Sequence, residues 1–283
     1  MRDASGRNYR TGCSKVLMDS AGETRPFPHV RPGTVEIAVL GQVAVRGAAG
    51  PFLRSAACDL AVYLAFHRAG VRHADWSLAL WPERPVSLST AYSTSSDVRR
   101  ALGRDPEGRL HLPRGVDLRL GDAVTTDVEH FAALAASDEP PLLVAAMGLI
   151  RGPLFAGMRR TDWAVFDGTQ SEIETLVVGT ALRAADLLVQ LESAAEAEWA
   201  VRQALRVSPY DERLYRSLLL AMAAQGNRVR LHAAMAQLRT LAGEAAHPGA
   251  PPAPADCLHP ATTDLYRDLL LGLPAAGGHP ARL

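Results

Sequence analysis

The segment Thr90–Gly103 (TAYSTSSDVRRALG) carries the side chains whose chemistry is most suggestive in this chain. Read at helical spacing, its exposed positions would hold small hydroxyls, which can hydrogen-bond to base edges or phosphates. Two adjacent arginines near its end would attract a phosphate backbone, although the same arginines would also favour the negative end of a helix dipole. The residues predicted to contact nucleic acid are Ser89, Thr90, Ser93, Ser96, Arg99, Arg100, Arg104, Arg109 and Arg114.

A helix must position these groups, and the sequence predicts one that begins after Ser87 or Ser89 and runs to Leu102, with Gly103 closing it. Its expected buried stripe has spacings of 3, 4, 3 and 4 residues, at Leu88, Ala91, Ser95, Val98 and Leu102. Two shorter helices are predicted before it, Arg54–Arg68 with one apolar face and His73–Trp81 with Trp76 and Trp81 in the core.

Short alternating runs predict β-strands on either side of these helices. Val35–Gly41 and Gln42–Arg46 precede them, and Arg109–Leu112 and Val116–Leu120 follow as an expected hairpin with Arg114 at its tip. Three helices followed by a β-wing is the order of a winged helix-turn-helix, which we place at residues 34–126.

Only helices are predicted after Asp127. They are Asp127–Ala136, Pro140–Ile150, Thr161–Leu191, Ala194–Val207, Asp211–Gln225, Arg228–Glu244 and Thr262–Leu271. Glu192 and Gly226 lie 34 residues apart, each at a turn between paired helices, which indicates a weak tetratricopeptide-like (TPR-like) repeat. The expected fold class is therefore mostly α, with an α+β winged helix followed by an all-α repeat domain at residues 127–272. Residues 1–33 are expected to form a disordered tail or linker, and residues 273–283 a second tail.

Composition excludes several classes of protein. Residues 34–126 carry eleven arginines against nine carboxylates, and residues 127–283 carry thirteen against eighteen, so any affinity for nucleic acid belongs to the front half. The three cysteines form no C-x-x-C pair, and the longest apolar run, Leu142–Ile150, is too short for a membrane span. No phosphate-binding or nucleophile motif is present. We expect a cytoplasmic protein with no metal, no cofactor, no membrane contact and no enzymatic activity.

Several blocks of sequence resemble one family. They are VLGQVAV (Val39–Val45), ALW (Ala79–Trp81), SDVRRALG (Ser96–Gly103), LPRG (Leu112–Gly115), DVEHFAAL (Asp127–Leu134), IRGPLFAGM (Ile150–Met158) with Trp163, ALRVSPYDERLYRSLLLAMAAQGNR (Ala204–Arg228) and DLYRDLL (Asp264–Leu270). The chain resembles the Streptomyces antibiotic regulatory proteins (SARPs), which join an OmpR-like winged helix to a bacterial transcriptional activator domain (BTAD). It is most similar to the BTAD region of larger actinobacterial proteins, so we expect a shortened relative or a fragment of one.

The resemblance implies a transcriptional regulator whose winged helix binds double-stranded promoter DNA and whose helical domain mediates homodimerisation or contacts RNA polymerase. One departure is Asp97, where the family's common pattern has arginine, so that a carboxylate would lie near the phosphates. Two alternatives stay open. The chain could be a protein–protein adaptor whose winged helix no longer binds DNA, or a sensor whose helical domain binds a small molecule.

Overall fold

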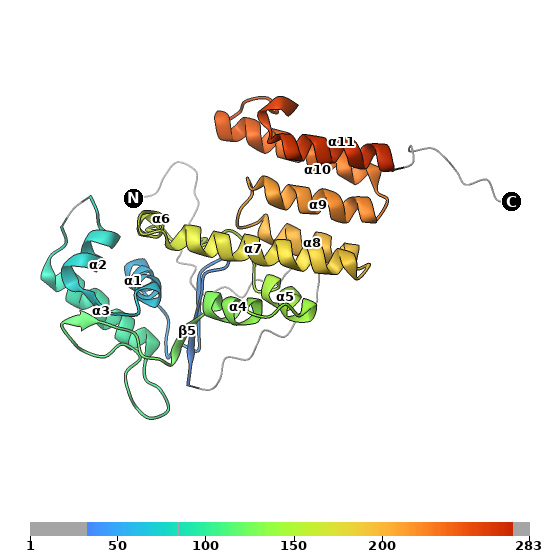
Figure 1. Ribbon diagram of the computed structural model, residues 1–283. Helices are drawn as coiled ribbons and strands as arrows, with labels where there is room; N and C mark the ends of the chain where they lie inside the picture. The colour runs from blue at the N-terminus through green and yellow to red at the C-terminus, as the bar shows by residue number, and fades with distance from the viewer. Residues whose placement is uncertain (1–32, 84, 274–283) are drawn as a thin grey trace, which may run out of the picture. The chain divides into compact units, whose positions relative to one another are not determined.

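The computed structural model describes residues 33–83 and 85–273. The two predicted tails therefore lie outside the described residues, apart from Gly33 and Leu273. The chain forms two compact units, coloured along the sequence in Figure 1. The first contains residues 43–126 with the strand before them and the segment Gly157–Trp163, and the second contains Val39–Gln42, Asp127–Ala156 and the chain from Ala164 onward. Most of the described residues in regular structure are helical, as the sequence predicted.

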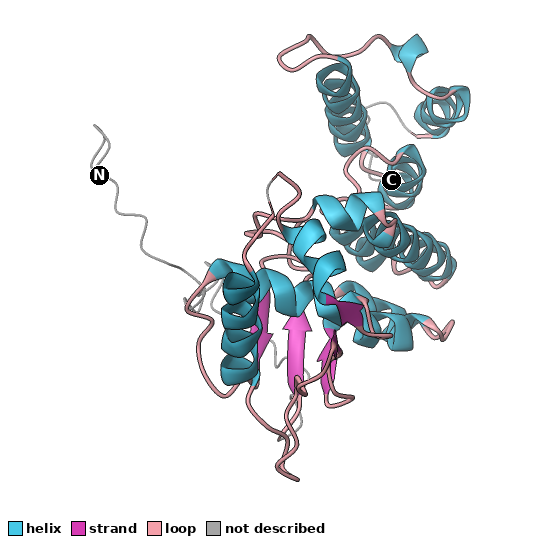
Figure 2. Cartoon of the chain, turned by 90° about the vertical axis from the view of Figure 1, so that its left-hand side faces the viewer, coloured by secondary structure: helices cyan, strands magenta, loops and turns pink. Residues whose placement is uncertain are grey.

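Three short strands form the sheet of the first unit, drawn in magenta in Figure 2. β1 (Val35–Ala38) lies between β2 (Ala44–Arg46), which is antiparallel to it, and β5 (Val124–Thr126), which is parallel. Ile37 pairs with both Val45 and Thr126. The first two strands were predicted. β5 was not, because its three residues are too few to show an alternating pattern.

Three helices follow the order that the sequence predicted. They are α1 (Ser55–Phe66), α2 (His73–Leu80) and α3 (Leu88–Leu102). The single apolar face expected for α1 is wrong, because every residue from Ala57 to Ala65 is buried. The helix contacts α2, α3, β1 and β5, so it lies at the centre of this unit. Of the two expected core tryptophans, Trp76 is buried and Trp81 is only half-buried.

The predicted hairpin between Arg109–Leu112 and Val116–Leu120 does not form. Instead β4 (Asp117–Leu118) pairs antiparallel with β3 (Val71–Arg72), which precedes α2. The backbone before β4 bonds to the residues just after α3, since His111 N donates to Gly103 O at 3.1 Å and Leu110 forms a bridge with Arg104. A partner from a distant two-residue strand leaves no pattern in the sequence, which is why the pairing was missed.

A buried ion pair attaches the segment Gly157–Trp163 to α1. Arg160 donates from Nη1 to Asp59 Oδ2 at 2.9 Å, and the carboxylate is 3% exposed. Trp163 is 5% exposed and its ring meets that of Tyr63 edge-on, with centroids 5.0 Å apart. The guanidinium of Arg160 also lies 5.5 Å from the centre of the Trp81 ring. This segment is therefore part of the core of the first unit, although helices of the second unit flank it in the sequence.

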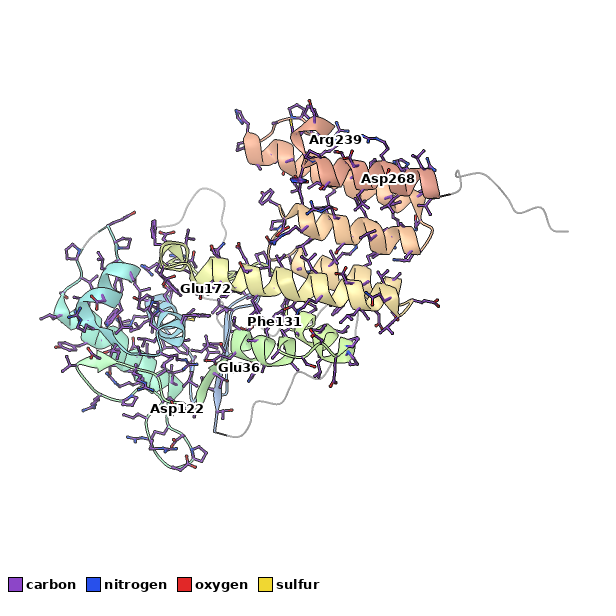
Figure 3. All side chains as sticks on the ribbon, viewed as in Figure 1. Glu36, Asp122, Phe131, Glu172, Arg239 and Asp268 are labelled. Carbon is purple, nitrogen blue, oxygen red and sulfur yellow. The ribbon has the colours of Figure 1, made fainter. Side chains whose placement is uncertain are left out.

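Antiparallel helices build the second unit. They are α4 (Asp127–Ala135), α5 (Pro140–Met147), α7 (Thr169–Gln190), α8 (Ala194–Ala204), α9 (Glu212–Ala224), α10 (Arg228–Ala246) and α11 (Pro260–Gly272), with a 3-10 turn, η1 (Ala255–Cys257), before the last. Figure 1 shows α7 to α11 running alongside one another. Helix α8 packs closely on α7 and α9, and α9 also packs on α10 and α11. Phe131 of α4, labelled in Figure 3, is fully buried.

The single long helix predicted at Thr161–Leu191 is wrong. The structure has two, α6 (Asp162–Phe166) and α7, separated at Gly168. Gly168 adopts a left-handed conformation (φ 85°), which ends one helix and which glycine accepts without strain. Asp167 then accepts a hydrogen bond from Thr169 N at 3.0 Å, so its side chain satisfies a backbone donor at the start of α7. The helical spacing of apolar residues continues across Gly168, and for this reason the sequence did not reveal the break.

The predicted repeat has matching turns. Glu192 and Gly226 both have positive φ, at 60° and 67°. After each of them the next amide bonds to a carbonyl five residues back, from Ser193 to Leu188 at 2.8 Å and from Asn227 to Met222 at 3.2 Å. This is the closure of a Schellman motif, and it ends both helices in the same way. The two turns predicted 34 residues apart are therefore confirmed as equivalent in geometry.

The buried carboxylate of Asp127 joins three segments of the second unit. Its two oxygens accept from Val39 N at 2.8 Å and Leu40 N at 3.0 Å, and Arg151 Nη2 donates to it at 2.6 Å. The residue is 1% exposed and begins α4. Arg151 N in turn donates to Leu40 O at 2.7 Å, so the chain that follows β1 is held from both sides.

None of the helices in the described ranges combines the length and the hydrophobicity that crossing a bilayer requires.

The buried pair on α1 predicts how stability depends on pH. Burial raises the pKa of Asp59 above its ordinary 3.8, although Arg160 opposes the shift. A carboxylate with a raised pKa in the folded state contributes stability below the unfolded pKa, and this contribution is lost as the pH rises through the folded value. We therefore expect the unfolding free energy of the wild type, measured by urea denaturation relative to Asp59→Asn, to fall as the pH rises from about 4.

Asp75→Asn, which removes an exposed carboxylate on α2, serves as the control for the loss of one charge. A difference between wild type and Asp59→Asn that stays constant with pH, or that grows in favour of the wild type, would contradict the expectation.

Candidate nucleic-acid interface

The orientation of α3 follows from its buried stripe. Ala91, Ser95, Val98 and Leu102 are buried as predicted, but Leu88 is 62% exposed. Ser87 caps the helix by accepting a hydrogen bond from Thr90 N at 3.2 Å.

Gly103 ends α3 with φ 76°. A Cβ there would lie 2.5 Å from the side chain of Ala49, so both the conformation and the space call for glycine. The buried stripe therefore sets which face of α3 points outward, and Ser87 and Gly103 set where the helix begins and ends.

Most of the predicted hydroxyl contacts are engaged within the helix. Ser89 and Thr90 each lie 2.9 Å from the hydroxyl of Ser87, and Ser93 donates to Thr90 O at 2.8 Å. Ser96 is exposed and has no hydrogen bond from its hydroxyl to the described residues. Three of the four predicted hydroxyls thus stabilise the first turns of α3 and have less capacity for a ligand.

Asp97 was expected to place a carboxylate near the phosphates, and in the structure this carboxylate neutralises two arginines. It forms ion pairs with Arg54, the residue before α1, and with Arg100, whose Nη1 is 3.0 Å from Asp97 Oδ1. The carboxylate is only 11% exposed, and Arg54 also donates to Ser93 Oγ at 3.3 Å. We call Arg54, Asp97 and Arg100 the Asp97 cluster. It connects the start of α1 to the exposed side of α3.

The arginines of the loop after α3 are also occupied. Arg109 donates to Asp105 at 2.7 Å and to Glu107 at 3.0 Å, and Arg104 donates to Gly108 O at 2.5 Å. Although partial burial opposes it, bonding to Arg109 lowers the pKa of Asp105, and the same bonding raises the pKa of Arg109. Loop residues 104–110 therefore form a closed, nearly neutral turn.

Neither Arg99 nor Arg114 has an acidic partner among the described residues. Arg104 also lacks one, but its guanidinium donates to the carbonyl of Gly108. Burial, and next the positive charge of Arg114, lower the pKa of the Arg99 guanidinium. The Nε of Arg99 is buried without a hydrogen-bond partner, and its Nη1 reaches only Ser95 Oγ at 3.3 Å. Arg114 is exposed in the loop before β4. These two guanidinium groups of the first unit therefore have charge that no acidic side chain of the described residues neutralises.

Two residues of this surface, Tyr92 and Arg54, were not among the residues predicted from the sequence. Tyr92 is 66% exposed on the outer face of α3, and its ring centroid lies 6.2 Å from that of His73. Its position four residues after Leu88 was a signal that the sequence offered. The pairing of Arg54 with Asp97 spans 43 residues, and no spacing rule could have found it.

An open hollow of about 480 Å³ lies beside the loop, lined by Asp105, Arg109, His111, Arg119 and Asp122, among others. Asp122 is labelled in Figure 3. Burial lowers the pKa of His111, against the charge of Asp105, which favours the neutral imidazole. Acidic and basic groups alternate in this hollow, so it favours neither an anion nor a cation.

In the second unit the charged groups hold helices together. Glu198 of α8 is 4% exposed and accepts from Arg202 at 2.8 Å and from Gln225 at 3.0 Å, and it also pairs with Arg230. Within residues 33–83 and 85–273, no group of three or more His, Cys, Asp or Glu side chains is arranged to hold a metal ion.

Comparison with known proteins identifies the helical part. Residues 119–242 match the family described as bacterial transcriptional activator domain. This part of the chain is similar to a BTAD. The matched residues run from just after β4 to α10, so they include β5 and the array from α4 through most of α10. The comparison with curated proteins found no match.

A solved structure of Mycobacterium tuberculosis EmbR in complex with a low affinity phosphopeptide has a similar fold. The identity is 22% and the TM-score 0.58, over 85% of this chain and 66% of that chain. This chain therefore spans slightly less than two thirds of EmbR. The expected resemblance to SARP-type proteins that contain a BTAD is confirmed, and so is the mostly helical fold with a small winged-helix unit.

The Asp97 cluster leads to a prediction about the stability of the first unit. Asp97→Arg would place a third guanidinium beside Arg54 and Arg100, so we expect it to lower the unfolding free energy by roughly 1–2 kcal/mol. Asp97→Asn should cost less, about 0.5–1 kcal/mol, because it removes the attraction without adding repulsion. Urea denaturation at low and high salt measures both, and salt should shrink the difference between the two variants.

The matched control is Asp75→Arg, since Asp75 also pairs with an arginine three residues away but at a much more exposed site. If Asp97→Arg proves as stable as Asp75→Arg, the Asp97 cluster does not stabilise the unit.

Proposed function

We propose that this protein is a transcriptional regulator that binds double-stranded DNA through α3 and the loop that follows it. The observation that carries the proposal is that neither Arg99 nor the exposed Arg114 has an acidic partner among the described residues, and that the buried Nε of Arg99 has no hydrogen-bond partner. Guanidinium groups without an acidic partner on a winged-helix unit suit the phosphates of a duplex. The BTAD match supports a role in transcription, and the element order of the first unit supports a major-groove position for α3.

The predicted residues are expected to contribute unequally to DNA affinity. Arg100, Arg104 and Arg109 are already paired or bonded, so each would have to exchange an internal partner for a phosphate. Such an exchange gains little, because one charge-assisted bond replaces another. We therefore infer that Arg99 and Arg114 supply most of the electrostatic affinity, and that Ser96 is available for a polar contact.

The domain organisation belongs to the same proposal. A winged helix at residues 34–126 would bind DNA, and a BTAD at residues 127–272 would mediate homodimerisation or contact RNA polymerase. A dimer would bind direct or inverted repeats, since one winged helix buries only a modest area of DNA. Such a protein would be cytoplasmic, would need no cofactor and would not be an enzyme.

A second candidate is a protein–protein adaptor. The neutralisation of Arg54, Arg100 and Arg109 by acidic neighbours on the same unit favours it, because a DNA-binding surface gains from unpaired cations. In that case the helical array would bind a peptide or a partner helix.

Salt dependence of binding separates the two candidates. We expect the wild type to bind a random 30-base-pair duplex in fluorescence anisotropy, with an affinity that falls steeply as salt rises. Arg99→Gln and Arg114→Gln should each reduce the slope of log K against log salt by about 0.9, the value of one phosphate contact. Arg99→Lys, which keeps the charge, should restore most of it.

Arg109→Gln is the matched control, because its guanidinium is held by Asp105 and Glu107, and its slope should equal that of the wild type. Absence of binding at about 50 mM salt would sink the DNA-binding proposal and favour the adaptor.

A further inference from the structure

The exposed face at the start of α3 presents two large apolar side chains. Leu88 is 62% exposed and Tyr92 is 66% exposed. They are four residues apart, so they lie one above the other on the same face of the helix. In helix-turn-helix proteins the N-terminal residues of this helix contact base edges. An apolar pair thus occupies the place where base recognition is expected.

The polar neighbours of this pair are poorly suited to read bases. The hydroxyls of Ser89, Thr90 and Ser93 are bonded to Ser87 or to the helix backbone at 2.8–2.9 Å. A hydroxyl that already donates within the helix offers a base only a lone pair. The hydrogen-bonding capacity of these first turns is therefore directed at the helix itself.

The residue types that normally recognise purines are missing from this part of α3. Guanine is read chiefly by Arg or Lys and adenine by Asn or Gln. Residues 88–98 contain none of these, and the first cation of the helix is Arg99. Among the groups that bases present in the major groove, the C5-methyl of thymine is the one that an apolar side chain recognises.

We propose that Leu88 and Tyr92 read thymine methyl groups in the major groove, so that this protein selects sites with thymine at those positions. The inference rests on the proposed DNA binding and adds its sequence preference. Arg99 lies two to three turns beyond the pair, so affinity would come from one end of α3 and selectivity from the other.

Uracil tests the proposal directly, because it differs from thymine only by the missing methyl. A duplex would first be enriched from a randomised library on the full chain, and then prepared with thymine or with deoxyuridine throughout. We expect the uracil duplex to bind the wild type more weakly, by about fourfold if one methyl is buried and about fifteenfold if two are, since each buried methyl contributes close to 0.8 kcal/mol. The slope of log K against log salt should be the same for both duplexes.

Variants assign the effect to residues. Tyr92→Ala should bind the two duplexes equally or nearly so, Leu88→Ala should reduce the difference, and Tyr92→Phe should keep it. Both side chains are exposed, so these variants should fold, which circular dichroism would verify. Tyr210→Ala removes an aromatic ring that is 58% exposed in the second unit, and it should leave the difference unchanged.

The outcomes distinguish failure of thymine recognition from failure of DNA binding itself. Equal binding of thymine and uracil duplexes by the wild type, or binding without any enriched sequence, would overturn thymine recognition while DNA binding stands. Discrimination that survives Tyr92→Ala and Leu88→Ala together would also overturn it. If neither duplex binds at about 50 mM salt, the proposed function fails as well. The apolar pair is then better explained as a contact for a protein partner.

Discussion

A buried carboxylate at the start of the helical array holds the path of the chain in place. Asp127 accepts from two consecutive amides, Val39 and Leu40, and from the guanidinium of Arg151. The amides of Val39 and Leu40 are buried, and a buried amide without a hydrogen-bond partner is costly. The segment after β1 is thereby committed to the second unit, which leaves β1 itself to pair with β2 and β5 in the first. The sheet that contacts α1, on which α3 packs, contains β1 as its central strand.

Charge pairing then decides what the surface of α3 offers. The first unit is only weakly basic, and acidic neighbours bind two of the five arginines that the sequence offered as phosphate contacts, Arg100 and Arg109. Asp97, expected to repel phosphates, instead attaches α3 to the residue before α1. What remains is a short list of unpaired groups, namely Arg99, Arg114 and Ser96, together with an apolar pair. A surface with few available cations suits binding of moderate affinity in which base contacts contribute a larger share.

Much of the fold could be predicted because local signals set it. The limits of α3 follow from a serine cap, an apolar stripe with spacings of three and four residues, and a closing glycine. The equivalent turns at Glu192 and Gly226 follow from their spacing of 34 residues. The predicted hairpin failed because β4 pairs with a strand that precedes α2. The long helix failed at Gly168, where one left-handed residue interrupts an unbroken apolar period.

The sequence by itself determined the order of elements, the mostly helical class and the face of α3 that is buried, because periodicity, caps and glycine act over a few residues. Only the tertiary structure decided which arginines are available. Arg54 meets Asp97 across 43 residues, and Arg160 meets Asp59 across 101. An ion pair depends on distance in space, and folding brings together residues whose separation in the chain carries no information about that distance.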